Sequence, residues 1–186
     1  FFILFSCNDK IDNNGKGNYI VFSGKDRVSS GFHIYISNID DGYPKKITWN
    51  PYNDKNPIVD SNRSKVFFLT DRDGGQKIFK FDLSWVGGTI EWMGDWIWES
   101  LPEAENAIPV FNDDEWYGFP SISPTGTHLA AMQYPFGQYD IVLFDQKGSF
   151  KKILTDQVYD DFFPQFSKDG LNIFYQKKVS NNNMEI

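Results

Sequence analysis

The sequence predicts an all-β fold, and its composition and the spacing of its turn residues are the reasons. Aromatic residues make up 18% of the 186 residues, and such side chains suit pleated, half-buried surfaces better than helices. Fifteen glycines and nine prolines recur between short apolar runs, which is typical of short strands joined by turns. No stretch carries apolar residues at i, i+3, i+4 and i+7 through several turns, so we expect no helix.

Charge and residue counts exclude several classes of function. The net charge is −7 and the sequence pI is about 4.8, so the protein as a whole repels nucleic acid. The one cysteine, Cys7, gives no internal disulfide and no cysteine-based zinc site. His33 lies on a predicted strand and His128 directly precedes one. We assign both histidines structural roles, and we expect no metal, no cofactor and no catalytic residue in this segment.

An internal repeat is the strongest signal. Three segments align on a proline, and in each the apolar strand begins nine residues after that proline: 57–66, 120–129 and 164–173. A turn lies between, with Gly126 and Gly170 in two copies and Arg63 in the third. Each of these strands, and one near the start of the chain, leads into a second strand, and these second strands cover 32–36, 76–81, 139–144 and 184–186.

The repeat length identifies the unit. Pro120 and Pro164 are 44 residues apart, as are Ile34 and Ile78, which matches a propeller blade of four strands. The run 66–69 is apolar at consecutive positions, as expected of a strand with sheets on both faces. A closed propeller has about 4 to 8 blades. Three repeats and a fourth that stops at Ile186 therefore predict an incomplete ring, cut short at its C-terminal end, and a closed four-bladed ring is the alternative.

The repeat resembles the TolB-type (WD40-like) β-propeller family. The resemblance rests on four motifs and on a recurring carboxylate. The motifs are Ser-Pro-Thr-Gly at 123–126, Ser-Lys-Asp-Gly at 167–170, Asp-Arg-Asp-Gly at 71–74 and Ile-Tyr at 34–35. Asp54 and Asp161 also match, each three residues before the proline, and Tyr117 departs from the pattern. The resemblance covers roughly residues 18–83 and 108–186, and it is nearly silent on function. Since propellers of this family close with about six blades, it implies that residues 18–186 form three to four blades of a longer ring.

The N-terminus resembles a bacterial lipoprotein signal. Leu4, Ser6 and Cys7 fit the end of such a signal, and a polar run follows the cysteine. Residues 1–17 are then a signal remnant with a flexible tether. The resemblance implies a lipid on Cys7, a place in the bacterial envelope as a periplasmic or outer-membrane lipoprotein, and membrane contact through that anchor only. The alternative is an edge strand in which Cys7 is a small buried hydrophobic residue.

The second blade carries an insertion at residues 84–106. Pro57 and Pro120 are 63 residues apart, which exceeds the repeat of 44 by 19. From 84 to 118 the chain has eight acidic residues and no lysine or arginine. The insertion contains our candidate binding residues, Trp85, Trp92, Trp96 and Trp98, because aromatic rings beside carboxylates suit protein and glycan surfaces. The alternatives are a hairpin that packs these rings on the flank of the propeller and a lid over the ring mouth.

The resemblances to TolB-type propellers and to a lipoprotein signal imply a non-enzymatic binding scaffold of the cell envelope, with envelope proteins or glycans as partners. No Gly-x-Ser-x-Gly, Gly-x-x-x-x-Gly-Lys or His-Glu-x-x-His motif is present in the sequence. Two alternatives stay open. One is the N-terminal propeller of a prolyl-oligopeptidase-like serine peptidase, and the other is a glycan-binding or glycan-active propeller.

Overall fold

The computed structural model describes residues 19–38, 44–60, 65–82, 107–134, 137–149, 151–155, 158–180 and 183–186. Within these residues the chain forms fourteen β-strands and no helix, so the predicted all-β class is confirmed. The strands belong to four antiparallel sheets.

Each sheet is built from consecutive strands. Sheet 1 contains β1 (Tyr19–Gly24), β2 (His33–Asn38) and β3 (Pro44–Lys46). Sheet 2 contains β4 (Lys55–Val59), β5 (Lys65–Thr70), β6 (Lys77–Asp82) and β7 (Ile108–Pro109). Sheet 3 contains β8 (Tyr117–Ile122), β9 (His128–Gln133), β10 (Asp140–Asp145) and β11 (Lys151–Ile153). Sheet 4 contains β12 (Asp161–Phe166), β13 (Ile173–Ser180) and β14 (Asn183–Glu185).

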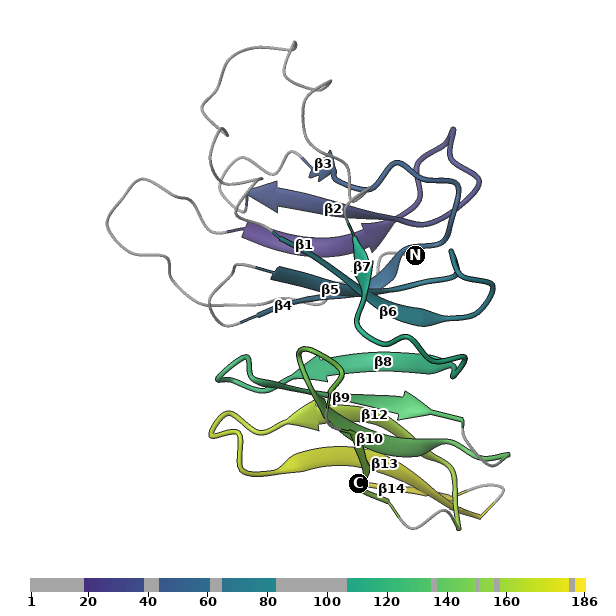
Figure 1. The fold of residues 1–186 in the computed structure, drawn as a ribbon, viewed down its shortest axis with the longest axis vertical. Helices are drawn as coiled ribbons and strands as arrows, with labels where there is room; N and C mark the ends of the chain where they lie inside the picture. Colours follow the sequence, from purple (N-terminus) through teal and green to yellow (C-terminus); the bar gives the residue numbers. More distant parts are fainter. Residues whose placement is uncertain are drawn as a thin grey trace.

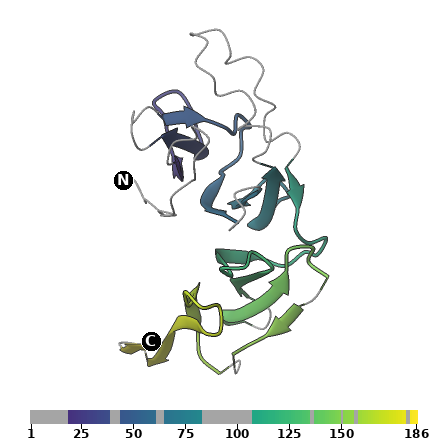
Figure 2. The same cartoon turned by 90° about the vertical axis from the view of Figure 1, so that its left-hand side faces the viewer.

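The sheets follow one another as the blades of an open propeller. They stack face to face in Figure 1, and the perpendicular view in Figure 2 shows that the stack bends into an arc. The first strands of sheets 2, 3 and 4 lie next to each other, since β4 contacts β8 and β8 contacts β12. The described residues form an incomplete ring of four blades, as the repeat predicted.

Three hydrophobic clusters fill the spaces between successive sheets. Strand β5 shows why this fold needs strands with apolar residues at consecutive positions. Val66 and Phe68 join the cluster shared with sheet 1, whereas Phe67 and Leu69 join the cluster shared with sheet 3. Both faces of the strand are therefore buried, which confirms the environment that the run 66–69 predicted.

The outer strands return to the same register in each complete repeat. Three equivalent backbone hydrogen bonds fix it: Ile47 N to Ile34 O at 2.8 Å, Val110 N to Ile78 O at 2.9 Å and Leu154 N to Ile141 O at 2.8 Å. The second bond closes across the 84–106 segment. The extra residues of sheet 2 therefore lie between β6 and β7 and leave the blade register unchanged.

The prolines of the repeat lie within strands, which the sequence did not predict. Pro57, Pro120 and Pro164 belong to β4, β8 and β12, and the pairing with the next strand is interrupted by a bulge at each. A bulge tolerates proline because the missing N–H is not needed for the ladder. The residue before each proline has a positive φ: 51° at Asn56, 44° at Phe119 and 54° at Phe163.

Candidate binding site at one end of the blades

Six loops meet at one end of the blades, which we call the loop end. Three join each outer strand to the inner strand of the next sheet (47–54, 110–116, 154–160), and the others join β1 to β2 (25–32), β5 to β6 (71–76) and β9 to β10 (134–139). Residues 135–136 and 156–157 of these loops lie outside the described residues. Backbone hydrogen bonds link successive sheets here: Asp54 N to Phe32 O at 2.8 Å, Tyr117 N to Gln76 O at 2.9 Å and Asp161 N to Tyr139 O at 2.7 Å. These repeated bonds hold the loops of neighbouring blades at fixed distances.

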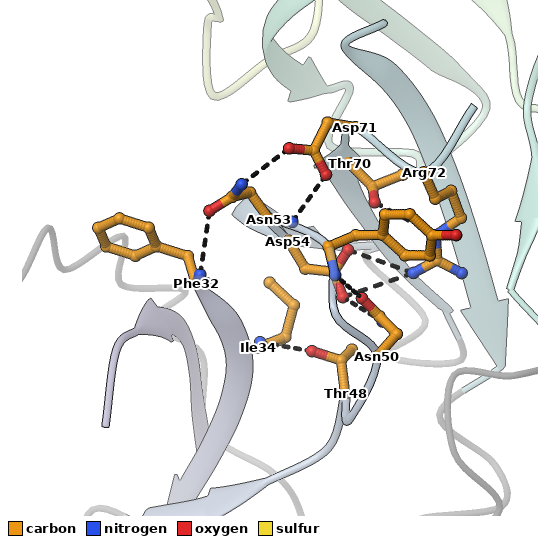
Figure 3. Close-up of polar contacts among 10 residues, drawn as sticks. Phe32, Ile34, Thr48, Asn50, Asn53, Asp54, Thr70, Asp71 and Arg72 are labelled. Carbon is orange, nitrogen blue, oxygen red and sulfur yellow. Dashed lines mark hydrogen bonds and ion pairs between the residues drawn. The ribbon is translucent and has the colours of Figure 1, made fainter. Parts of the chain in front are cut away.

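A buried ion pair anchors the loop end of sheet 2 (Figure 3). The Asp54 side chain is 0% exposed and accepts hydrogen bonds from Arg72 Nη2 at 3.2 Å and from Asn50 Nδ2 at 2.8 Å. The Arg72 guanidinium also lies over the ring of Phe79, 4.8 Å from its centroid. A buried carboxylate needs such partners because an uncompensated charge is costly away from water.

Asn53 joins three loops around this pair. Its backbone N–H and its amide nitrogen donate to the two carboxylate oxygens of Asp71 at 2.8 and 2.7 Å, and its Oδ1 accepts from Phe32 N at 3.2 Å. Asp71 belongs to the predicted Asp-Arg-Asp-Gly turn, which Gly74 N closes on Asp71 O at 3.2 Å. The turn thus supplies Asp71 to Asn53 and Arg72 to Asp54, and these contacts explain its sequence.

Two threonines repeat one hydrogen bond at the end of the outer strands. Ile34 N donates to Thr48 Oγ1 at 2.9 Å, and Ile141 N donates to Thr155 Oγ1 at 3.1 Å. Thr155 in turn donates to Asp140 at 3.0 Å. The sequence places Thr48 after Ile47 and Thr155 after Leu154, each 14 residues beyond the strand residue whose N–H it accepts. The threonine thus adds one more hydrogen bond between the second-last and the outer strand of the blade.

Tyr117 takes the place of the aspartate in sheet 3. Like Asp54 and Asp161, it is the fully buried residue at the loop end of its inner strand. Its hydroxyl donates to Asp113 at 2.6 Å, and its ring packs against Phe111 at 4.8 Å. Burial and this bond raise the pKa of Tyr117 above its ordinary value. In sheet 3, the hydrogen bond from Tyr117 to Asp113 therefore takes the place that the ion pair of Asp54 and Arg72 has in sheet 2.

Exposed aromatic side chains gather at the loop end. Trp49 is 48% exposed, Tyr52 40%, Tyr134 46% and Tyr159 41%. In the turns at the opposite end, the described residues expose one large apolar side chain, Leu171. The rings are held in place, since Lys46 Nζ lies 4.9 Å from the Trp49 ring centroid and Lys177 Nζ lies 5.3 Å from that of Tyr159.

Solved structures share this architecture, although no protein-family model and no curated protein matches the sequence. A putative TolB from Agrobacterium tumefaciens superposes with a TM-score of 0.67 and 19% identity over 88% of this chain and 51% of that chain. TolB from Acinetobacter baumannii gives 0.63 and 15% over 90% of this chain and 40% of that one.

The fold is that of a TolB-like β-propeller. A puromycin-hydrolyzing peptidase from Mycobacterium tuberculosis is also similar, with a TM-score of 0.61 and 14% identity over 90% of this chain and 25% of that chain. This chain therefore spans about half or less of the length of these neighbours.

Some residues predicted from the sequence fall within the described TolB-like propeller and some do not. Cys7 and the four tryptophans of the insertion, Trp85, Trp92, Trp96 and Trp98, lie outside the described residues. His33 is buried and His128 is exposed, with its ring nitrogen 2.9 Å from Thr127 Oγ1. In the described part of the chain, no group of three or more histidine, cysteine or acidic residues is placed to hold a metal ion. The same residues contain no helix with the length and hydropathy of a membrane span.

Two parts of the predicted acidic region are described. Asp113 accepts a hydrogen bond from Tyr117 and lies 3.9 Å from Lys151 Nζ, and its backbone carbonyl accepts from Lys77. Ile108 and Pro109 form β7. The described residues of the acidic region before β8 therefore take part in the hydrogen bonds and strands of the propeller.

Sequence reasoning missed the exposed rings of the loop end. Their signal was nevertheless present, because Tyr52 and Tyr159 each stand two residues before the repeated aspartate. The propeller brings these tyrosines to one surface by turning the chain at the same end in each blade.

Proposed function

We propose that this chain is a non-enzymatic binding module that acts through the loop end of its TolB-like propeller. The observation that carries the proposal is the concentration of exposed rings there, at Trp49, Tyr52, Tyr134 and Tyr159. Exposed tyrosine and tryptophan are enriched in recognition surfaces because they offer a large contact area and a polar group together. Hydrogen bonds between the blades support the loops, so little ordering is required on binding.

The cell envelope is the proposed location, with lipid on Cys7 as the attachment to the membrane. The resemblance of the first seven residues to a lipoprotein signal supports this placement, as does the polar run from Asn8 to Asn18. Detergent partitioning of the protein made in its host, with Cys7→Ser as the control, tests the anchor. We expect the wild type in the detergent phase and the variant in the aqueous phase, and equal aqueous partitioning would overturn the anchor.

Site-specific photocrosslinking tests the binding surface. A photoreactive amino acid placed at Tyr52 or Tyr159 is expected to form a discrete adduct in the host envelope. The same photoreactive amino acid in place of Leu171, which is exposed at the opposite end, is the matched control. We expect it to form no adduct. Equal adducts from the two ends, or adducts from Leu171 alone, would show that the loop end is not the binding surface.

The second candidate function is the propeller of a peptidase. Two puromycin-hydrolyzing enzymes are among the structural neighbours, and this chain covers 25% and 23% of their lengths. Similarity below 25% identity supports the fold and leaves the activity open. The reading frame beyond Ile186 decides the matter, because a Gly-x-Ser-x-Gly motif there and hydrolysis of chromogenic aminoacyl substrates by the whole protein would favour the peptidase.

A further inference from the structure

Three loops around sheet 2 give the loop end a local excess of negative charge. These loops, which we call the acidic surface, are 47–54, 71–76 and 110–116. Together they contain six acidic residues and one basic residue, Arg72. Arg72 is already paired with the buried carboxylate of Asp54. The other five carboxylates have no basic residue within these loops: Asp71, Asp73, Asp113, Asp114 and Glu115.

Side-chain hydrogen bonds join the three loops into one surface. Asn53, in the first loop, donates to both carboxylate oxygens of Asp71 in the second, at 2.8 and 2.7 Å (Figure 3). Lys77, directly after the second loop, donates to the backbone carbonyl of Asp113 in the third. The carboxylates are therefore held on a connected support, and little ordering is required when a partner binds.

Most of these carboxylates are open to a partner. Three are exposed and two are half-buried: Asp71, Asp73 and Asp114, and Asp113 and Glu115. Partial burial would raise the pKa of Asp71, but hydrogen bonds from Asn53 hold it below its ordinary value, so the group is charged at neutral pH. An ionised carboxylate offers about four acceptor positions, of which Asn53 fills two.

Exposed aromatic rings belong to the same surface. Tyr52 is 40% exposed and directly precedes Asn53, the residue that binds Asp71. Trp49, three residues earlier in the same loop, is 48% exposed. Its ring already accepts a cation, since Lys46 Nζ lies 4.9 Å from the ring centroid. The acidic surface thus combines carboxylates with rings whose faces attract positive charge.

The charge of this surface distinguishes between classes of partner. Five carboxylates repel an anionic ligand such as nucleic acid or an acidic lipid, and a neutral ligand leaves their mutual repulsion uncompensated. The excess is local, because the adjacent loop 25–32 carries Lys25 and Arg27. In the turns at the opposite end, two acidic residues are matched by two basic ones: 123–127, 145–149 and 167–172. A cationic partner is therefore the class that complements both the rings and the carboxylates.

We propose that the acidic surface binds an arginine-containing segment of a partner protein, with guanidinium groups stacked on Tyr52 and paired with the exposed carboxylates. Arginine suits the surface better than lysine, because a planar guanidinium can lie on a ring and offer two parallel N–H donors to a carboxylate. Arg72 shows both contacts within the chain, on the ring of Phe79 and on Asp54. This inference rests on the proposed binding function and names the chemistry of its partner.

Fluorescence anisotropy with a labelled peptide of alternating arginine and glycine tests the proposal on the whole protein at about 0.15 M salt. We expect saturable binding, weaker binding of the lysine peptide and none of the peptide with neutral citrulline. Asp73→Asn/Asp114→Asn should weaken the affinity about three- to tenfold, the effect of two exposed ion pairs. Tyr52→Ala should weaken it about threefold through the lost cation–π contact.

The matched control is Asp82→Asn/Asp169→Asn, which removes the same charge from exposed residues at the opposite end and should leave the affinity unchanged. Equal losses from the two double variants would show attraction by net charge alone and would overturn the proposal. Equal binding of the citrulline peptide would overturn it as well. Circular dichroism and thermal unfolding of each variant show whether a lost affinity reflects lost structure.

The outcomes also separate this proposal from the one on which it rests. If the arginine peptide does not bind while a photocrosslink from Tyr52 captures a protein and one from Leu171 does not, the loop end is a binding surface and the proposed partner chemistry is wrong. If neither the peptide binds nor crosslinks form, both proposals fail.

Discussion

At the scale of single residues, the loop end shows how the charged residues of one blade are replaced by uncharged residues in the next. Lys55, the residue after Asp54, stands opposite Leu69 across the β4–β5 pair, and Tyr117 stands opposite Gln133 in the equivalent pair. The repeat that places Pro120 63 residues after Pro57 places Pro135 of sheet 3 at the position that Arg72 has in sheet 2. Carboxylate and guanidinium are thus replaced together. A buried charge cannot be left behind without its partner, because desolvation then has no compensation.

Arg72→Met is expected to destabilise the protein by about 3–5 kcal/mol, because it leaves the buried Asp54 carboxylate uncompensated. Methionine keeps the apolar contact with Phe79. The free energy of unfolding in urea measures the effect. Lys65→Met is the control, since its pair with Asp82 is partly exposed on both sides and should matter by less than about 1 kcal/mol. If Arg72→Met and Lys65→Met lowered the free energy of unfolding equally, Arg72 would not be the group that compensates the charge of Asp54.

His33 is expected to make stability depend on pH. Burial, and then the charge of Lys46, hold the pKa of His33 below its ordinary value. The unfolded chain therefore takes up a proton at a higher pH than the folded chain does. The free energy of unfolding should fall as pH drops through the ordinary histidine range of about 6.5 toward the lower folded pKa.

Urea unfolding of the wild type and His33→Gln at pH 7.5 and 5.5 checks this dependence. The wild type should lose more stability over the interval than His33→Gln, which cannot bind the proton. His128→Gln, at an exposed ring, is the matched control and should behave as the wild type does. Identical slopes for the wild type and His33→Gln would show that His33 does not contribute.

At the scale of elements, each inner strand is shaped by its bulge. The positive φ at Asn56, Phe119 and Phe163 recurs at the same position in β4, β8 and β12, so it is a property of the repeat. Asparagine tolerates this conformation better than most residues with a side chain, and glycine accepts it without strain. The proline that follows gives up no ladder bond there.

Asn56→Ala is expected to lower the free energy of unfolding, but by less than the about 1–2 kcal/mol that a Cβ atom costs in a left-handed conformation, because asparagine also carries a Cβ atom and only tolerates this conformation better. Asn56→Gly should be close to neutral. Thermal and urea unfolding of the two variants measure the difference. Asn112→Ala, at an exposed position in the loop before β8, is the control. If alanine and glycine behave alike at residue 56, the backbone there is not strained.

Residues 84–106 are expected to be replaceable by a short turn without unfolding the blades. Val110 N still reaches Ile78 O at 2.9 Å after the segment, as the equivalent residues do in sheets 1 and 3. Loop length in itself costs little, about 0.6 kcal/mol per doubling. Far-UV circular dichroism and a cooperative melt of the shortened protein test the prediction. Precipitation or loss of cooperativity would mean that Trp85, Trp92, Trp96 and Trp98 pack on the propeller.

At the scale of the whole molecule, the blades stabilise one another through the clusters between them. Sheet 4 packs on sheet 3 through Ile173 and Tyr175. Its other face presents Phe174, 56% exposed, and Met184, 48% exposed. Within the described residues, no other sheet covers this face. Faces of this kind and unpaired strand edges promote association.

The 186-residue polypeptide is expected to self-associate and to melt early. Sedimentation velocity over a wide range of protein concentration should show association, and Phe174→Glu should reduce it. Lys168→Glu, at an exposed turn, controls for the change in charge and should have no such effect. A sharp monomer that unfolds cooperatively above about 60 °C would favour the closed four-bladed ring instead.

The fold class, the period of 44 residues and the place of the insertion could be predicted from the order of residues alone. These properties follow from local chemistry, because strand length, turn residues and alternating burial are written along the chain. The prediction of a TolB-like propeller was confirmed on the same ground. The anchor at Cys7 and the surface at the four tryptophans stay predictions, since those residues lie outside the described structure.

Which residues come into contact could not be predicted, because it depends on how the sheets pack. The tertiary structure placed Pro57, Pro120 and Pro164 inside strands, because the bulge that admits them exists only against a partner strand. It joined Arg72 to Asp54 across 18 residues, and it gathered Trp49, Tyr52, Tyr134 and Tyr159 at one end. Distance along the chain does not say which loops share an end. That depends on the direction of every strand in four sheets, a property of the packed ring and not of any one segment.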